Sequence, residues 1–314
     1  MTQTNLPFIS IVTVVKDDFA NFVLTAVSLS RQSEPNFEWV VVDGSSDQQV
    51  RGYLEQIDHQ FAVVYQHLEP KGIYNAMNFG VKISNSSWIW ILNAGDFLLT
   101  PDAISKMSSL IQDSKADLIA SQVINLSTSG YMVSISKPET IDANGYLIAN
   151  FNHQGVVMLK KNLEKLGLFD ESFKFAADGK LLDQAIRDFT FHCTDHAFVA
   201  FLLGGASSQN YRTTIRETLE YRPAIKRRLA NVKSSMRNFA RLRLLKSERT
   251  HFLNWFSVLY FKNREIKLHS ELLNLRVIHT NECSSKCSIL RHVNEPCYQI
   301  LRDIVSSVPR NGLS

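Results

Sequence analysis

The chain has 314 residues, 45% of them hydrophobic, and a formal net charge of +4 at pH 7, a length that accommodates one large α/β domain with an appendage or two domains. We expect neither a signal peptide nor a membrane-spanning helix: no basic run precedes an apolar stretch at the start, and no apolar segment approaches the roughly 20 residues of a span. Four cysteines in a chain of this size do not indicate a secreted disulfide framework, which favours a cytoplasmic protein with reduced thiols.

The first half of the chain alternates between predicted strands and predicted helices. Runs of β-branched and apolar residues predict the strands, and apolar residues at helical spacing predict the helices. A strand, a helix and a second strand in this order predict a right-handed parallel crossover. The predicted strands cover residues 8–15, 37–42, 61–65 and 88–92, and the predicted helices cover residues 22–32, a segment ending near 57, and the segment from Lys71-Gly72 to about 83.

The segment 88–96 is the most informative part of this half. Its first five residues are bulky and apolar without alternation, which predicts a strand covered on both faces, as in a parallel sheet between helices. Asn93-Ala94-Gly95-Asp96 then ends the strand with a carboxylate at its carboxyl end. Two other strands end in polar clusters, Lys16-Asp17 and residues 43–47, and all three clusters should meet at one edge of the sheet. The sequence therefore predicts a ligand pocket there.

The second half is predicted less regularly. Residues 127–150 are rich in turns and have no assigned element, whereas His153-Gln154 heads an apolar strand that ends at residue 159. The other predicted elements are helices at residues 101–112, 162–166 and 180–187 and strands at residues 117–123 and 197–203.

Several motifs in order resemble those of the family-2 glycosyltransferases, inverting enzymes of the GT-A fold. The resemblance runs from about residue 8 to about residue 222, and it departs from the family pattern at Asn75, Asn93, Gly179 and Lys180. It implies an α/β fold of GT-A type, a Rossmann-like and mostly parallel sheet flanked by helices. The motifs are residues 10–13, 40–47, 71–78 and 92–96, His153-Gln154, residues 169–171 and residues 176–178.

A divalent cation suits the implied reaction, because negative charge builds on the diphosphate that leaves a nucleotide-sugar. Mn²⁺ and Mg²⁺ prefer oxygen ligands and tolerate one protein carboxylate when phosphates and water complete the shell. We therefore expect Asp96 to bind the metal, with Asn93 acting through water or toward the ribose and Lys71 adding positive charge. A simple turn with a solvated Asp96 is the alternative interpretation.

The resemblance also implies a set of nucleotide-sugar-binding residues. Asp43 would accept a hydrogen bond from the base, while Thr13 and Val15 would line the base and ribose pocket through their backbone. Asp43 as an ordinary turn residue and the segment 72–78 as a plain amphipathic helix are the alternatives. The remaining members of the set are Lys71, Gly72, Tyr74, Asn75, Asn93 and Ala94.

An acceptor hydroxyl needs a general base, and inversion requires that base on the face opposite the leaving group. The resemblance assigns this role to Asp178. The alternative interpretation is that Asp178 only caps the start of its helix. Its competitors are Asp170, Asp183 and Asp188. His153 and Gln154 are expected on the acceptor or diphosphate side, the alternative being a core histidine satisfied by backbone.

The composition changes near residue 221, so we divide the chain into a catalytic domain at residues 1–220 and a helical C-terminal extension at residues 221–314. Basic residues recur between Arg222 and Arg249 against a single acidic one, Glu248, and apolar residues alternate with them at helical spacing. This pattern favours an anionic membrane surface, or else a solvated helix packing on the catalytic domain. No nucleic-acid-binding motif is recognised. The final segment could support self-association, and the spacing of Cys283, Cys287, His292 and Cys297 matches no standard zinc pattern.

The sequence as a whole predicts a peripheral membrane glycosyltransferase at the inner face of the cell membrane. It would move a sugar from a UDP-, GDP- or dTDP-sugar to a lipid-linked glycan or growing surface polysaccharide. The alternatives are a nucleotidyltransferase, although no Gly- and Arg-rich phosphate loop follows the first strand, and a non-catalytic nucleotide-sugar-binding partner in an assembly complex.

Overall fold

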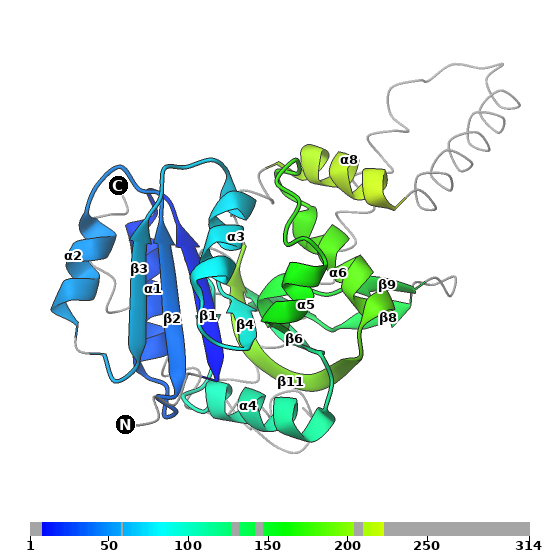
Figure 1. The fold of residues 1–314 in the computed structure, drawn as a ribbon, viewed down its shortest axis with the longest axis horizontal. Coiled ribbons are helices and arrows are strands. Elements are labelled where there is room, and N and C mark those ends of the chain that lie inside the picture. Colours follow the sequence, from blue (N-terminus) through cyan, green and yellow to red (C-terminus); the bar gives the residue numbers. More distant parts are fainter. Residues whose placement is uncertain (1–7, 58, 127–131, 142–146, 204–209, 223–314) are drawn as a thin grey trace, which may run out of the picture.

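The computed structural model describes residues 8–57, 59–126, 132–141, 147–203 and 210–222 (Figure 1). The prediction of a basic amphipathic helix beyond residue 222 lies outside these residues. So do Cys283, Cys287, His292 and Cys297. In the part of the chain that is described, no helix is both long and apolar enough to cross a membrane.

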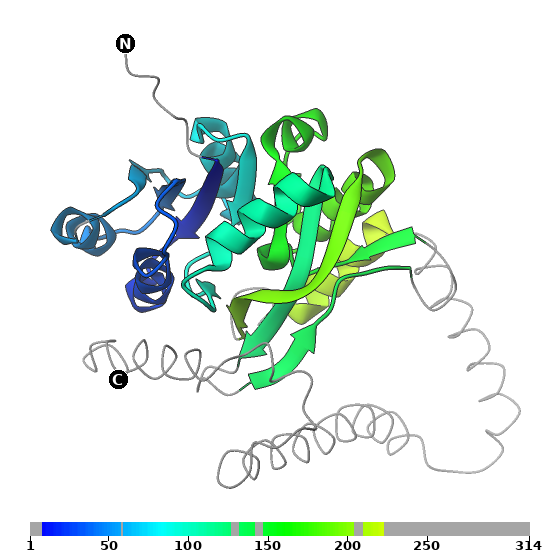
Figure 2. The same cartoon turned by 90° about the horizontal axis from the view of Figure 1, so that it is seen from below.

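One nine-stranded sheet forms the centre of the molecule, in the order β3-β2-β1-β4-β10-β6-β11-β5, with β7 paired to β6. The first four strands along this order are parallel, and β6 and β11 are also parallel. Figure 2 shows the long strands β6 and β11 lying side by side and curling away from the flatter half. The strands are β1 (Ile9–Val15), β2 (Phe37–Asp43), β3 (Ala62–His67), β4 (Trp88–Ile91), β5 (Phe97–Leu98), β6 (Leu118–Leu126), β7 (Met132–Ser136), β10 (Val156–Leu159) and β11 (Phe191–Leu202).

Helices cover both faces of the sheet, because alternate residues of each central strand point to opposite sides. In β1, Ile9 and Ile11 pack in one core cluster, and Val12 and Val14 pack in the other. Helices α1 (Phe19–Ser30), α2 (Gln49–Gln56) and α4 (Ala103–Ser114) contribute to the first cluster; α3 (Ile73–Ile83), α5 (Lys160–Lys165) and α6 (Ala177–Asp188) contribute to the second. The predicted α/β class, a mostly parallel sheet flanked by helices, is confirmed.

The second half of the chain contains more structure than the sequence predicted. Helix α8 (Tyr211–Tyr221) was not predicted, and neither were β5, β7 and the two-stranded sheet of β8 (Glu139–Ile141) and β9 (Leu147–Asn150). Strand β11 begins at Phe191 rather than at 197, because the residues that follow Phe191 are mostly polar and exposed and lack an apolar signal. Helix α6 begins at Ala177 rather than at 180. Strand β10 pairs antiparallel with both β4 and β6, which joins the two halves of the sheet.

Candidate active site

Three polar strand ends meet at one edge of the parallel half of the sheet, as the sequence predicted. Strand β1 lies between β2 and β4 and is parallel to both. The loops after them remain in contact, since Gly44 N donates to Val15 O at 2.9 Å and Ala94 N donates to Val14 O at 3.2 Å. With neighbouring strands about 4.8 Å apart, the ends of β2 and β4 are separated by roughly 10 Å.

The turn that contains Asn93 and Asp96 is fixed by hydrogen bonds to the side chain of Thr25 in α1. Its hydroxyl donates to Asp96 O at 2.7 Å and accepts from Gly95 N at 3.1 Å, and it also lies 3.2 Å from Asn93 O. Gly95 has a φ of 96°, a backbone conformation that side chains with a Cβ disfavour. This turn therefore depends on a glycine within it and on one buried hydroxyl on a helix far away in sequence.

Asp96 is almost completely buried at 3% exposure, and its Oδ2 has no hydrogen-bond partner. Burial raises the pKa of this carboxyl to about 7, although attraction by His153 and a hydrogen bond from the Gln154 side chain oppose the shift. A buried carboxylate oxygen without a partner is costly, which makes Asp96 a candidate for binding a ligand or an ion.

His153 joins the Asp96 side of the site to Asp178. Its Nδ1 lies 2.8 Å from Asp178 Oδ2, and its Nε2 lies 3.3 Å from Asn93 Nδ2. The other carboxylate oxygen of Asp178 accepts a hydrogen bond of 2.9 Å from the Tyr74 hydroxyl. That hydroxyl in turn accepts from Ala177 N, at the start of α6. Four segments far apart in the sequence, those of Tyr74, Asn93, His153 and Asp178, therefore meet around one partly buried imidazole.

The charges within this cluster reinforce one another. Burial alone would raise the pKa of Asp178, but hydrogen bonds from His153 and Tyr74 and the attraction of His153 hold it below its ordinary value. For His153, burial acts to lower the pKa, and the hydrogen bond and charge of Asp178 outweigh it, so that the pKa is raised. Burial and Asp178 also raise the pKa of Tyr74, which keeps its hydroxyl a donor. Asp178 is thus an oriented carboxylate that is 25% exposed.

The three competitors of Asp178 for the role of base are placed differently. Asp183 is 2% exposed and is paired with Arg222 through both of its oxygens. Asp170 is paired with Lys180. Asp188 is exposed at the far end of α6, about 15 Å along the helix axis from Asp178. Of these four carboxylates, only Asp178 contacts the cluster around His153.

The residues expected to bind the nucleotide lie on the other side of β1 from the cluster of Tyr74, His153 and Asp178. Asp43 is fully buried, where Oδ1 accepts from Ser45 N at 2.8 Å and Oδ2 accepts from the Tyr65 hydroxyl at 3.0 Å. Thr13 is also buried within β1, where it is paired with Val41 of β2, and its side-chain oxygen accepts from Trp39 Nε1. Val15 is buried beside it. The nucleotide roles of these residues stay predictions.

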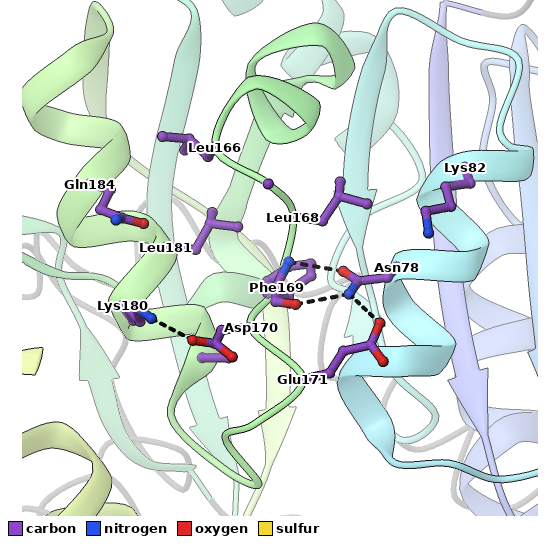
Figure 3. Close-up of a pocket in the computed structure, with 12 residues that line it drawn as sticks. Asn78, Lys82, Leu166, Leu168, Phe169, Asp170, Glu171, Lys180, Leu181 and Gln184 are labelled. Carbon is purple, nitrogen blue, oxygen red and sulfur yellow. Dashed lines mark hydrogen bonds and ion pairs between the residues drawn. The ribbon is translucent and has the colours of Figure 1, made fainter. Parts of the chain in front are cut away.

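Lys71 and Gly72 are exposed at the entrance to α3, and Gly72 has a φ of 118°. Asn75 does not point toward the cluster around His153: its Nδ2 donates to Glu171 Oε2 at 2.9 Å. Asn78 donates to the other oxygen of Glu171 and exchanges two hydrogen bonds with the backbone of Phe169 (Figure 3).

The motif at residues 169–171 therefore has a structural use. Glu171 is bound to α3 and Asp170 is bound to Lys180 of α6, along a groove of about 450 Å³ between the two helices (Figure 3). This loop holds α3, which carries Tyr74, against α6, which carries Asp178. The sequence motif was recognised, but the partners of its carboxylates were not predicted.

The residues around Asp96 fit a divalent cation. Within the described residues, no group of three or more His, Cys, Asp and Glu side chains is arranged as a metal site. Asp96 Oδ2 and Asn93 Oδ1 are nevertheless both buried without a partner. Two such oxygens suit Mg²⁺ or Mn²⁺ when phosphate oxygens complete the coordination shell.

Sequence reasoning missed several residues that shape the site. Thr25 had a detectable signal, since it is a polar residue on the apolar face of a predicted helix. Tyr65 had none, because its contact with Asp43 depends on how β3 is placed beside β2. The same holds for Glu217 and Arg222, whose partners lie on segments about 40 residues earlier.

Residues 10–165 match the family model described as glycosyl transferase family 2. The chain belongs to this family. Among curated relatives, an uncharacterized glycosyltransferase of Mycobacterium tuberculosis is 30% identical over 106 residues, which cover 33% of this chain and 40% of the relative. A PGL/p-HBAD biosynthesis glycosyltransferase of Mycobacterium bovis is 29% identical over 105 residues, 32% of this chain and 41% of the relative. The chain thus spans about 40% of the length of the curated relatives it matches.

Solved structures share the fold of this glycosyl transferase family 2 chain. Staphylococcus aureus TarS 1–349 in complex with UDP has a TM-score of 0.53 at 18% identity, covering 66% of this chain and 63% of that one. The mannosyltransferase PcManGT from Pyrobaculum calidifontis, in complex with GDP-Man and Mn²⁺, has a TM-score of 0.53 at 13% identity. The match covers 98% of this chain and 89% of that one. The GT-A fold class predicted from the sequence motifs is therefore confirmed.

Proposed function

We propose that the protein is an inverting glycosyltransferase that moves a sugar from a nucleotide-sugar to a hydroxyl of a lipid-linked glycan or a growing surface polysaccharide. The observation that carries the proposal is the position of His153 between Asp178 and the turn of Asn93 and Asp96. One carboxylate, that of Asp178, is oriented for proton transfer, and the other, that of Asp96, is buried with one oxygen, Oδ2, that lacks a partner. This pair of environments suits a base on one side of a sugar and a diphosphate on the other.

In the proposed step, the acceptor oxygen forms a bond to the anomeric carbon while the bond from that carbon to the diphosphate breaks. The electron pair of the broken bond stays on the diphosphate, and the proton of the acceptor hydroxyl passes to Asp178. His153 and Tyr74 each bind one oxygen of Asp178, and each oxygen keeps a lone pair for that hydroxyl. When bound at Asp96 and Asn93, Mn²⁺ or Mg²⁺ supplies positive charge that stabilises the leaving diphosphate.

The donor is proposed to lie across the ends of β2, β1 and β4. Asp43, Thr13 and Val15 would face the base and ribose, and Lys71 and Gly72 would lie near the phosphates. The complexes of TarS with UDP and UDP-GlcNAc and of PcManGT with GDP-Man and Mn²⁺ support a nucleotide-sugar donor with a divalent cation.

A lipid-linked acceptor and a position at the inner face of the cell membrane are part of the proposal. The basic composition beyond Arg222 supports an anionic membrane surface as partner. The relatives named as PGL/p-HBAD biosynthesis glycosyltransferases support transfer to an acceptor in a biosynthetic pathway. The boundary between a catalytic domain at residues 1–220 and an extension at residues 221–314 is proposed on the same change in composition.

A thermal-shift screen of UDP, GDP and dTDP, each with and without Mn²⁺, tests the binding part of the proposal. One diphosphate should raise the melting temperature more with Mn²⁺ than without it, because a ligand that binds the folded form stabilises it. The matching nucleotide-sugars are then assayed for hydrolysis and for transfer to a lipid-linked acceptor, with Asp178→Asn as the variant that lacks the base.

Three outcomes separate the proposal from its alternatives. Release of a nucleoside diphosphate from the nucleotide-sugar, with the sugar passed to water or to the acceptor, supports a glycosyltransferase. Release of pyrophosphate from a nucleoside triphosphate and a sugar phosphate would identify a nucleotidyltransferase. Stabilisation by a nucleotide-sugar without turnover of any donor or acceptor would identify a binding partner.

A further inference from the structure

Helix α8 packs against the loop and first turn of α6, which carry Asp178 (Figure 1). Glu217 of α8 is 6% exposed, and its two carboxylate oxygens accept hydrogen bonds from Lys174 N at 3.0 Å and from Phe175 N at 2.9 Å. These two backbone groups immediately precede α6. A buried charge fully paired with backbone donors fixes the path of the chain into that helix.

The end of α8 is fixed to the middle of α6 by a second buried charge. The Arg222 guanidinium donates to both oxygens of Asp183, at 2.7 Å and 2.8 Å, and to Ala149 O at 2.9 Å. Asp183 also accepts from Ala149 N at 2.8 Å. Arg222 and Asp183 thus form a bidentate pair that also binds both backbone groups of Ala149, a geometry that tolerates little displacement.

Tyr221 lies between these two anchors, directly over Gly179. A Cβ at position 179 would overlap the Tyr221 hydroxyl oxygen, and the next ring atom, Cζ, would lie 3.4 Å from it. The Tyr221 ring also packs against Phe173, with centroids 6.3 Å apart. Because Arg222 is the next residue and is anchored, the ring has little freedom to move away from α6. Gly179 is the neighbour of Asp178, so this contact acts on the backbone that carries the carboxylate.

We propose that α8 is a positioning element for Asp178 and that Tyr221, packed on Gly179, is the positioning residue that fixes the first turn of α6. This inference rests on the proposed function, in which Asp178 is the base. The residues of α8 act on Asp178 mainly through the backbone of α6 on which they pack, and the charge of Asp178 also reaches Tyr221 and Arg222 directly. A base displaced by about 1 Å loses much of its effect on rate.

A four-way comparison of wild type, Gly179→Ala, Tyr221→Phe and the double variant tests the inference. Alanine at 179 adds the Cβ that overlaps the hydroxyl, and phenylalanine at 221 removes that oxygen, so the double variant has room again. We expect Gly179→Ala to lower kcat by about 10-fold to 100-fold with the KM for the donor changed less than about 2-fold. The double variant should recover the kcat of Tyr221→Phe.

The matched control is Gly52→Ala in α2, where an added Cβ meets no atom within 4 Å. This variant makes the same substitution within a helix and should keep wild-type kcat. If Gly179→Ala behaves like Gly52→Ala, or if Tyr221→Phe does not restore the double variant, the inference is wrong.

A second readout does not depend on transfer activity. In full-length protein with 15N-labelled histidine, the His153 Nδ1 resonance reports its bond to Asp178, and His153→Gln assigns it. Gly179→Ala should shift this resonance and the double variant should return it. Absence of turnover with every donor would count against the proposed function, while the resonance would still decide the role of α8. Should Gly179→Ala not fold, Tyr221→Leu removes the ring without adding an atom, and an unmoved His153 resonance in that variant would overturn the inference.

Discussion

The imidazole of His153 lies 2.8 Å from the carboxylate of Asp178, although 24 residues and a complete strand and helix separate them in sequence. The pairing fixes which ring nitrogen faces Asp178 and leaves Nε2 facing the turn at residues 93–96. A proton or charge change on either side of the site is therefore felt on the other. The two carboxylates nevertheless lie on different sides of the imidazole, so each can be replaced without removing the other.

Asp178→Asn should abolish most transfer and leave donor binding intact. Asparagine keeps the size of the side chain and can still contact His153 and Tyr74, but it cannot take the proton of an acceptor hydroxyl. We expect kcat to fall by about 10²-fold to 10⁴-fold, with the affinity for a nucleoside diphosphate, measured by calorimetry, within about 2-fold of wild type. The control is Asp188→Asn, at the exposed end of the same helix. Full transfer activity in Asp178→Asn would remove Asp178 as the base.

Protons and divalent cations should compete for Asp96. Burial raises the pKa of this carboxyl to about 7, above the value near 4 in an unfolded chain. Without a cation, the folded protein binds this proton more tightly than the unfolded chain, so stability falls as the pH rises from about 4 to about 7. A cation that binds the ionised carboxylate compensates for this loss. The rise in melting temperature caused by Mn²⁺ should therefore be larger at pH 8 than at pH 6.

Asp96→Asn should remove most of that Mn²⁺ effect and its pH dependence, whereas Asp113→Asn, an exposed carboxylate of α4, should leave both unchanged. An equal Mn²⁺ effect at the two pH values in wild type would show that Asp96 is not where the cation binds.

The parallel half of the sheet was predictable because its signals are local. The residues from Trp88 to Ile91 are all bulky and apolar, so the sequence itself predicts that they are buried. The polar residues after each strand indicate the edge of the sheet at which the strands end. The ordered motifs also indicated that Asp96, His153 and Asp178 belong together, and the structure brings them into one cluster. Their chemical roles remain predictions.

The rest of the site depends on contacts between distant segments, which leave no local signal. The partner of Asp43 is Tyr65, and the residues that fix α6 are Glu217 and Arg222 on a helix that the sequence did not predict. A polar residue in a strand or on a helix gives no sign in the sequence that tertiary packing will bury it against a particular partner. The first half of β11 was missed for the related reason that its polar residues pair with β6 without an apolar face.

Thr25→Val should loosen the turn that presents Asp96. Valine has nearly the same shape but leaves Asp96 O without its 2.7 Å donor in a buried position. We expect a loss of about 1–3 kcal/mol in the free energy of unfolding, measured in urea, and weaker Mn²⁺ binding. Thr25→Ser keeps the hydroxyl and should recover most of both. Ser30→Ala, an exposed hydroxyl later in the same helix, is the control for stability. A Thr25→Val protein as stable as wild type would show that backbone bonds alone hold the turn.

Tyr65→Phe tests whether Asp43 recognises the nucleotide. Each oxygen of the buried Asp43 carboxylate accepts a hydrogen bond, one from Ser45 N and one from the Tyr65 hydroxyl, so these two donors set the orientation in which Asp43 would meet a base. Burial and the bond to Asp43 raise the pKa of Tyr65 to about 12, which keeps the hydroxyl protonated and donating at working pH. Removing that donor leaves one carboxylate oxygen unpaired and free to turn away from the base.

The loss of one hydrogen bond is worth about 1 kcal/mol, so the affinity for the preferred nucleoside diphosphate should fall roughly 5-fold by calorimetry. The preference in affinity for this diphosphate over the diphosphates of other bases should also become smaller. The kcat at saturating donor should stay near the wild-type value, because the cluster around His153 is not changed. Tyr53→Phe is the matched control, since that ring packs between α1 and α2 against Phe19 and Phe22, away from Asp43. If Tyr65→Phe and Tyr53→Phe bind nucleotides equally well, recognition of the base does not depend on the orientation of Asp43.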